Sequence, residues 1–213
     1  RSPDLSRGRQ MLDQLLAGGT YVNVHTPAWP GGAVRGQALP DGTSVTFANL
    51  EGGQQVPGAV ETSAAGRAGL TWNADGDVWI HVQTDLAATA VHLHNGVAGT
   101  NGGVLVGLTE DSATAGHWAT EGETLSGDDL AALRTASTYI NAHSEANPAG
   151  ELRGQVLPDG YELVLTSLEG GQQIPAVATM ASGMAATTLQ ASTGWLRLHA
   201  NTTGADDATA CLL

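Results

Sequence analysis

The chain repeats part of itself at a fixed offset of 118 residues. The segment 50–57 (LEGGQQVP) returns as 168–175 (LEGGQQIP), with seven of eight residues identical. Residues 21–26 and 34–42 return at the same offset, as 139–144 and 152–160. A unit that recurs at a fixed period is one structural module. We therefore expect 43–160 to be a complete module, 1–42 the C-terminal part of another and 161–213 the N-terminal part of a third.

The two flanking pieces, of 42 and 53 residues, are together shorter than one 118-residue module, which leaves three arrangements open. The chain belongs to a longer tandem array, or the two pieces pack together as a permuted second domain, or they are exchanged between neighbouring chains. Exchange would give self-association through the incomplete terminal modules, since head-to-tail contacts form open polymers when the rotation does not close.

Short β-type runs separated by Gly, Asp and Asn fill the central module. They are residues 44–50, 68–72, 77–84, 90–94, 103–108, 139–144 and 151–157. With 29 glycines and many Thr and Val, this spacing predicts an all-β fold, a Greek-key β-sandwich or flattened barrel. Ser126 and Asp129 form a capping-box pattern ahead of Leu130 and Leu133, which predicts one short helix per module.

The charge balance excludes nucleic acid as a partner, and the length of the apolar runs excludes a membrane span. The chain carries 21 acidic residues against eight arginines and no lysine, a net charge of −13. Nucleic acid would be repelled, and no basic stripe interleaved with aromatic residues is present. The longest apolar runs fall well short of the roughly 18 residues that cross a bilayer, so no membrane span is expected.

Alternation along the strands predicts a polar outer face that collects histidines. Successive side chains in a strand point to opposite faces. Val91 and Leu93 take the core side, which leaves His92 and His94 outside. The same rule places outside the side chains of Trp79, His81, Gln83, Tyr139, Asn141, His143, Glu151, Arg153 and Gln155.

The His-X-His pattern is the candidate metal site. It puts two imidazoles on one side of a strand about 7 Å apart, near enough to bind one ion. His143 is the expected third ligand, and His117, in a loop, is a fourth candidate; His81 is expected to support the ligands through a hydrogen bond. Neutral imidazoles suit copper or zinc, whereas calcium and magnesium prefer oxygen. The alternative is that these histidines are ordinary polar residues on a solvated sheet face.

The flanking pieces lack the histidine pair. At the 118-residue offset His92 and His94 fall on Ala210 and Leu212, and Glu151 falls on Ala33. We therefore expect one metal site at most in this chain. Cys211 takes the inward position of Leu93, which predicts a buried thiol.

In their order along the chain, these motifs resemble the CHRD (chordin) domain family. Residues 90–96 (AVHLHNG) are similar to its Ala-X-His-X-His-X-Gly strand. Residues 139–144 (YINAHS) and 147–155 (NPAGELRGQ) are similar to its Tyr-X-Asn-X-His-Thr/Ser and Asn-Pro-X-Gly-Glu-X-Arg-Gly-Gln blocks. The resemblance implies a β domain, often in tandem, located extracellularly, in the periplasm or on the cell surface. It also implies a binding role, since animal members bind growth factors.

A more distant likeness is to copper-zinc superoxide dismutase. On that analogy His92, His94 and His143 look like copper ligands and Arg153 like a guanidinium that guides an anion, with Glu151 and Asn141 in support. No zinc subsite accompanies them, and the acidic field would slow an approaching superoxide anion. We therefore expect a binding or scaffold module with a copper or zinc site rather than an enzyme. The alternatives are a copper redox enzyme and a purely structural repeat of a filament or matrix.

Overall fold

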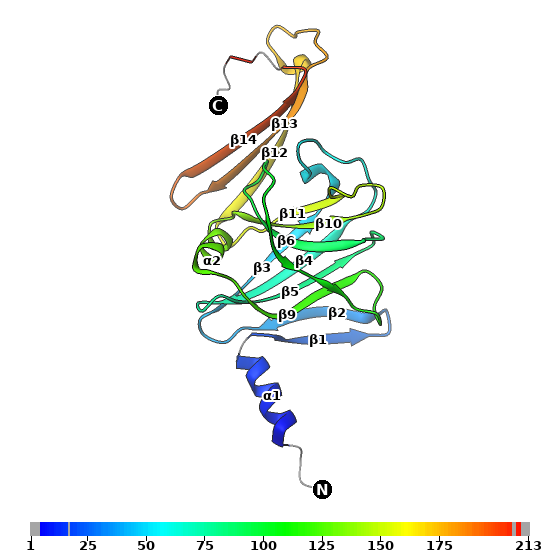
Figure 1. Cartoon of the computed structure of the whole chain (residues 1–213), viewed down its shortest axis with the longest axis vertical. Coiled ribbons are helices and arrows are strands. Elements are labelled where there is room, and N and C mark those ends of the chain that lie inside the picture. Colours follow the sequence, from blue (N-terminus) through cyan, green and yellow to red (C-terminus); the bar gives the residue numbers. More distant parts are fainter. Residues whose placement is uncertain (1–4, 17, 206–207, 210–213) are drawn as a thin grey trace.

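Residues 43–160 fold into a two-sheet β-sandwich (Figure 1). The computed structural model describes residues 5–16, 18–205 and 208–209, so the predictions for Ala210, Cys211 and Leu212 lie outside the described residues. One antiparallel sheet has the order β3-β4-β5-β9-β8, and the other has the order β11-β10-β6-β7. Their bounds are β3 Thr43–Leu50, β4 Gly66–Asn73, β5 Asp77–Thr84, β6 Ala90–Asn95, β7 Val104–Gly107, β8 Thr109–Glu110, β9 His117–Thr124, β10 Thr138–His143 and β11 Leu152–Gln155.

The core lies between the inner faces of these two sheets. Alternate residues of β3, β4 and β5 meet alternate residues of β6, β10 and β11, and the largest of them are fully buried: Leu50, Leu70, Val78, Ile80, Val82, Val91, Leu93, Ile140 and Leu152. The helix α2 (Gly127–Arg134) adds Leu130 and Leu133 to this core. Its cap is the predicted one, since the Ser126 side chain accepts a hydrogen bond from the Asp129 backbone N–H.

The flanking pieces form smaller units at opposite ends of the sandwich (Figure 1). At one end stand the helix α1 (Leu5–Leu16) and the hairpin of β1 (Thr20–Thr26) and β2 (Trp29–Ala38). At the other end, β12 (Tyr161–Glu169), β13 (Ser182–Gln190) and β14 (Trp195–Thr203) form a three-stranded sheet. Short 3₁₀ turns, η1 (Gly52–Gln54) and η2 (Gly170–Gln172), follow β3 and β12 at equivalent places.

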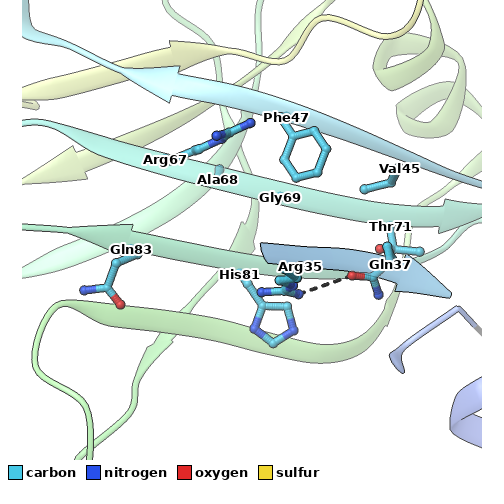
Figure 2. Close-up of a pocket in the computed structure, with 10 residues that line it drawn as sticks. All are labelled: Arg35, Gln37, Val45, Phe47, Arg67, Ala68, Gly69, Thr71, His81 and Gln83. Carbon is cyan, nitrogen blue, oxygen red and sulfur yellow. Dashed lines mark hydrogen bonds between the residues drawn. The ribbon is translucent and has the colours of Figure 1, made fainter. Parts of the chain in front are cut away.

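Polar side chains lie between each piece and the central sandwich. The hairpin stands over the outer face of the five-stranded sheet, where Arg35 and Gln37 of β2 face His81 of β5 across a groove of about 400 Å³ (Figure 2). The three-stranded sheet reaches the central sandwich through Asn201 Nδ2, which donates to Gly99 O at 2.9 Å, and Arg197, which donates to Ser137 Oγ at 3.1 Å.

The all-β sandwich is confirmed, and in the part of the chain that the structure describes the sheets do not close into a barrel. The strands β8 and β9 were not predicted, and β11 is shorter than the expected 151–157. No helix among the described residues has the length and apolar character needed to cross a bilayer.

Candidate metal centre

Three histidines from two neighbouring strands converge on the outer face of the four-stranded sheet. The register pairs Asn141 of β10 with His92 of β6, which puts His143 diagonally beside His92. One ligand atom from each of His92, His94 and His143 lies within 4.8 Å of the other two. The ring centroids are separated by 5.6 Å for His92 and His94, 5.0 Å for His92 and His143 and 6.2 Å for His94 and His143. The predicted trio is therefore brought together.

His94 is held in one orientation and leaves one nitrogen free. Its Nδ1 lies 3.1 Å from the carbonyl oxygen of Gly102, an acceptor only, so Nδ1 carries the proton and donates. Its ring stacks on Tyr139, with centroids 4.9 Å apart and planes at 12°. The opposite nitrogen, Nε2, is buried and has no hydrogen-bond partner among the described residues. An imidazole locked through one nitrogen with the other unpaired has the form of a metal ligand.

His143 is oriented in the same way by a second carbonyl. Its Nδ1 lies 3.0 Å from Pro148 O, which fixes the proton on Nδ1 and leaves Nε2 as a lone pair. That Nε2 lies 3.1 Å from His92 Nδ1. Without a metal the His92 Nδ1–H donates to it. If His92 moves its proton to Nε2, each of the three histidines offers a nitrogen lone pair within this cluster.

Burial favours the uncharged form of two of these histidines. The pKa of His92 is lowered by desolvation and by the neighbouring His143, and the pKa of His94 is lowered mainly by desolvation, against its hydrogen bond to Gly102. Neutral imidazole is the form that binds a metal, so a lowered pKa allows the site to bind a metal at lower pH values.

The loop that orients His94 is anchored by Arg153. The guanidinium donates to Thr100 O at 2.7 Å, to Val97 O at 3.0 Å and to Gln155 Oε1 at 3.1 Å. It lies 3.6 Å above the ring of Tyr139, whose hydroxyl accepts from the Gly102 N–H at 3.2 Å. Arg153, Tyr139 and His94 thus stack in series beneath the 97–102 loop.

The loop that orients His143 is anchored by Glu151. Ser144 Oγ and Asn147 Nδ2 donate to one carboxylate oxygen, and Thr62 Oγ1 donates to the other at 2.7 Å. These three hydrogen bonds lower the pKa of Glu151 and keep it ionised. Asn141 Nδ2 donates to Ala149 O at 3.3 Å, which ties the same loop to β10.

The comparisons with known proteins bear on these residues. The family model of the CHRD domain matches residues 5–38 and 46–156, more than half of the chain. The chain belongs to the CHRD domain family. Neither the curated proteins nor the solved structures gave a match. The segment 46–156 contains the three histidines and both orienting loops, so the candidate centre lies within the CHRD domain.

The outer face of this CHRD sheet is covered, which the alternation rule did not predict. Arg153 is 1% exposed, and Tyr139, Asn141, Glu151 and Gln155 are buried too. Segments 51–62 and 96–102 cross over them, and Gln55, for example, donates to Asn141 Oδ1 at 2.7 Å. In the structure the two terminal nitrogens of Arg153 donate to groups beneath a loop and do not face solvent. A supporting role behind the histidines fits the contacts of Arg153, Glu151 and Asn141.

Two predicted site residues lie elsewhere. His81 and His117 are on β5 and β9 of the other sheet, stacked at 5.5 Å between centroids, with His81 Nδ1 3.3 Å from His117 Nε2. His117 also lies 3.5 Å from the carboxylate of Asp111. The structure does not bring His117 to the cluster as a fourth ligand or His81 as a supporting residue, because β5 and β9 belong to the opposite layer of the sandwich.

The strand pattern of the sequence does not predict the two carbonyl oxygens that set the imidazole orientations. Gly102 O belongs to a loop that alternation does not describe. The one sign of this loop in the sequence is the glycine at 102; in the structure a Cβ there would lie 1.6 Å from Asn95 O, so the loop needs glycine.

Proposed function

We propose that this CHRD domain is an extracytoplasmic binding and scaffold module that holds one copper or zinc ion on His92, His94 and His143. The observation that carries the proposal is the buried, unpartnered Nε2 of His94, directed into a cluster of three ligand atoms within 4.8 Å. A buried polar atom without a partner costs about 1–3 kcal/mol. Coordination of a metal would give that atom the partner it lacks.

The donor set selects the class of metal. Zinc with three histidines and an open fourth position is a well-known arrangement, and imidazole also suits copper. His92 and His143 are partly exposed, so a fourth ligand, water or a side chain of a partner, has access from solvent. Copper(II) is expected to bind more tightly than zinc at the same nitrogen set.

The family supports the location and the general role. CHRD domains are typically extracellular, and the described residues contain no membrane-spanning helix. The candidate ligands lie on the outer face of the four-stranded sheet, on its two central strands, which suits a metal that shapes a surface for a partner. The superoxide dismutase alternative has less support, because Arg153 is buried and its terminal nitrogens donate to Thr100 O and Val97 O.

The experiment is a metal titration with a matched pair of variants. The chain is stripped with a chelator, titrated calorimetrically with zinc and with copper, and analysed for metal content by mass spectrometry. His143→Asn removes a proposed ligand. His25→Asn is the control, since His25 Nδ1 also contacts a proline carbonyl, Pro30 O at 2.8 Å, but lies outside the cluster.

We expect one metal ion per chain in the wild type and in His25→Asn. We expect a fall in affinity of about 100-fold or more in His143→Asn, since removing a ligand costs more than the 10–100-fold typical of an outer-shell partner. Equal binding by both variants, or no stoichiometric metal in the wild type, would rule out the site. Superoxide dismutation by the copper-loaded chain above the rate of free copper would instead support a redox enzyme.

A further inference from the structure

The flanking pieces keep the internal geometry of the central domain. The register of the β1–β2 hairpin pairs Tyr21 with Gln37, as β10–β11 pairs Tyr139 with Gln155. Arg35 lies 3.6 Å above the ring of Tyr21 and donates to Gln37 Oε1 at 3.2 Å, as Arg153 does with Tyr139 and Gln155. The hairpin is therefore a preformed copy of the β10–β11 half of a CHRD sandwich.

The hairpin lacks the cover that its counterpart has. Val22 and Val34 are each 66% exposed, and Val24 is 49% exposed. At the 118-residue offset these positions correspond to Ile140, Ala142 and Leu152, which are all 0% exposed in the central core. The polar side of the hairpin faces the five-stranded sheet, so its apolar side is left in solvent.

The helix before the hairpin shows the same contrast. Leu12 and Leu15 of α1 are 52% and 43% exposed, whereas their counterparts Leu130 and Leu133 of α2 are buried in the core. The apolar stripe of α1 thus corresponds to the stripe of α2 that packs into the central core. Both α1 and the β1–β2 hairpin therefore expose apolar side chains whose counterparts are buried in the central core.

The three-stranded sheet exposes the opposite half of the same interface. Its strands pair as β3, β4 and β5 do, and Leu196 of β14 corresponds to the fully buried Val78 of β5. Leu196 is 46% exposed and Val164 of β12 is 48% exposed. The contacts to Gly99 and Ser137 use Asn201 and Arg197, on the other face of this sheet, so the apolar face points away from the central domain.

The central domain shows what covers each face. There the apolar side of β10 and β11 packs on the apolar side of β3, β4 and β5, with α2 at the margin. The hairpin together with α1 corresponds to one half of that interface, and the three-stranded sheet corresponds to the other half. They sit at opposite ends of the chain's fold (Figure 1), and the side of each piece that faces the central domain is the polar one.

We propose that the apolar face of the α1–β1–β2 segment of one chain binds the apolar face of the β12–β14 sheet of a second copy, giving a head-to-tail assembly. Charge favours this pairing over like with like. Residues 1–42 contain four arginines and three acidic residues, whereas 161–213 contain one arginine and four acidic residues. The N-terminal segment is the one positive part of a strongly acidic chain.

Association and metal binding are separable in this proposal. At the 118-residue offset the positions of His92 and His94 hold Ala210 and Leu212, so the proposed interface does not depend on the histidine cluster.

The test uses two variants that each disable one face, together with a matched control. Val22→Glu/Val34→Glu disables the hairpin face, and Val164→Glu/Leu196→Glu disables the sheet face. The control, Phe47→Glu/Val104→Glu, places the same charges at two apolar positions that are 51% and 55% exposed on the central domain. Molar mass is measured by sedimentation velocity and light scattering over a wide concentration range in the presence of a chelator, after circular dichroism confirms folding.

We expect the molar mass of the wild type and of the control to rise with concentration. Each face variant should remain monomeric or self-associate at least about tenfold more weakly, as expected for disrupting a central apolar contact. An equimolar mixture of the two face variants should form a one-to-one heterodimer and stop there, because it retains one intact hairpin and one intact sheet. A monomeric wild type would overturn the proposal, including the case in which the two pieces close within one chain. Association of the wild type without pairing in the mixture would overturn it in favour of like-with-like contacts.

Discussion

Replacing Arg153 by methionine tests whether one buried cation organises the candidate metal centre. Methionine keeps the unbranched stem against Tyr139 and removes the guanidinium. Two backbone carbonyls, Thr100 O and Val97 O, then lose their donors under a buried loop. Burial has already lowered the pKa of Arg153 to about 10, which reflects how little solvent reaches the group.

The expected loss of stability follows from these contacts. Each buried carbonyl left unsatisfied costs about 1–3 kcal/mol. The desolvated cation over the Tyr139 ring contributes about 2 kcal/mol more. Release of the buried charge offsets part of this sum, so we expect the free energy of unfolding to fall by about 3 kcal/mol, within the range for removing one member of a buried polar network.

The metal affinity should fall with the stability. The 97–102 loop carries the Gly102 carbonyl that orients His94, and loss of such an outer-shell contact typically costs 10–100-fold in metal affinity. Urea unfolding followed by circular dichroism in chelator measures the first effect, and calorimetric titration with zinc measures the second.

Arg67→Met is the control for this prediction. Arg67 lies on the exposed face of β4 above the ring of Phe47 at 4.9 Å, so the substitution removes the same group from a solvated cation–π contact. We expect a change of about 0.5–1 kcal/mol at most for the control. A similar small change in Arg153→Met, with unaltered zinc affinity, would refute the reasoning, because water would then be replacing the guanidinium.

Two further predictions concern the same centre. Gly102→Ala should weaken zinc binding about 10–100-fold, because the added Cβ would lie 1.6 Å from Asn95 O. Gly103→Ala is the control and should bind zinc as the wild type does, since nothing lies within 4 Å of its added Cβ. Zinc titration of the two variants measures the difference, and equal affinities would contradict the prediction. In chelator, the free energy of unfolding should fall as the pH drops below about 6.5. The pKa values of His92 and His94 are lowered in the folded chain, so the unfolded chain binds more protons than the folded chain at these two residues. Urea titrations across pH should show a smaller fall in His94→Gln, and superimposable curves for the two proteins would count against the neutral cluster.

The position of the histidine trio was predictable, but its surroundings were not. Alternation fixes which face of a strand a side chain takes, and the diagonal neighbours His92 and His143 follow from the pairing of β6 with β10. Alternation says nothing about segments that fold back over that face. Arg153, expected in solvent, is buried for this reason, and the carbonyls that orient the imidazoles come from loops without a strand period.

The internal repeat predicts more of the flanks than of the site. The hairpin and the three-stranded sheet stand where the 118-residue offset places them, and α1 overlaps the counterpart of α2. The offset also predicts which of their residues are inward-facing, such as Val22 and Leu196. It does not predict that each piece meets the central domain with its polar side, because nothing in the repeat describes contacts between modules.

The repeat also separates what belongs to the scaffold from what belongs to the metal. In the hairpin, Asn23 Nδ2 donates to Gly31 O and His25 contacts Pro30 O, as Asn141 donates to Ala149 O and His143 contacts Pro148 O in the central domain. A carbonyl-oriented histidine at this strand end is therefore a feature of the module, present where no ligand cluster forms among the described residues. The feature that the hairpin does not share is the neighbouring strand with His92 and His94. The case for a metal thus depends on the unpaired His94 Nε2 and its convergence with His143, and the contrast between His143→Asn and His25→Asn isolates that convergence from the shared scaffold.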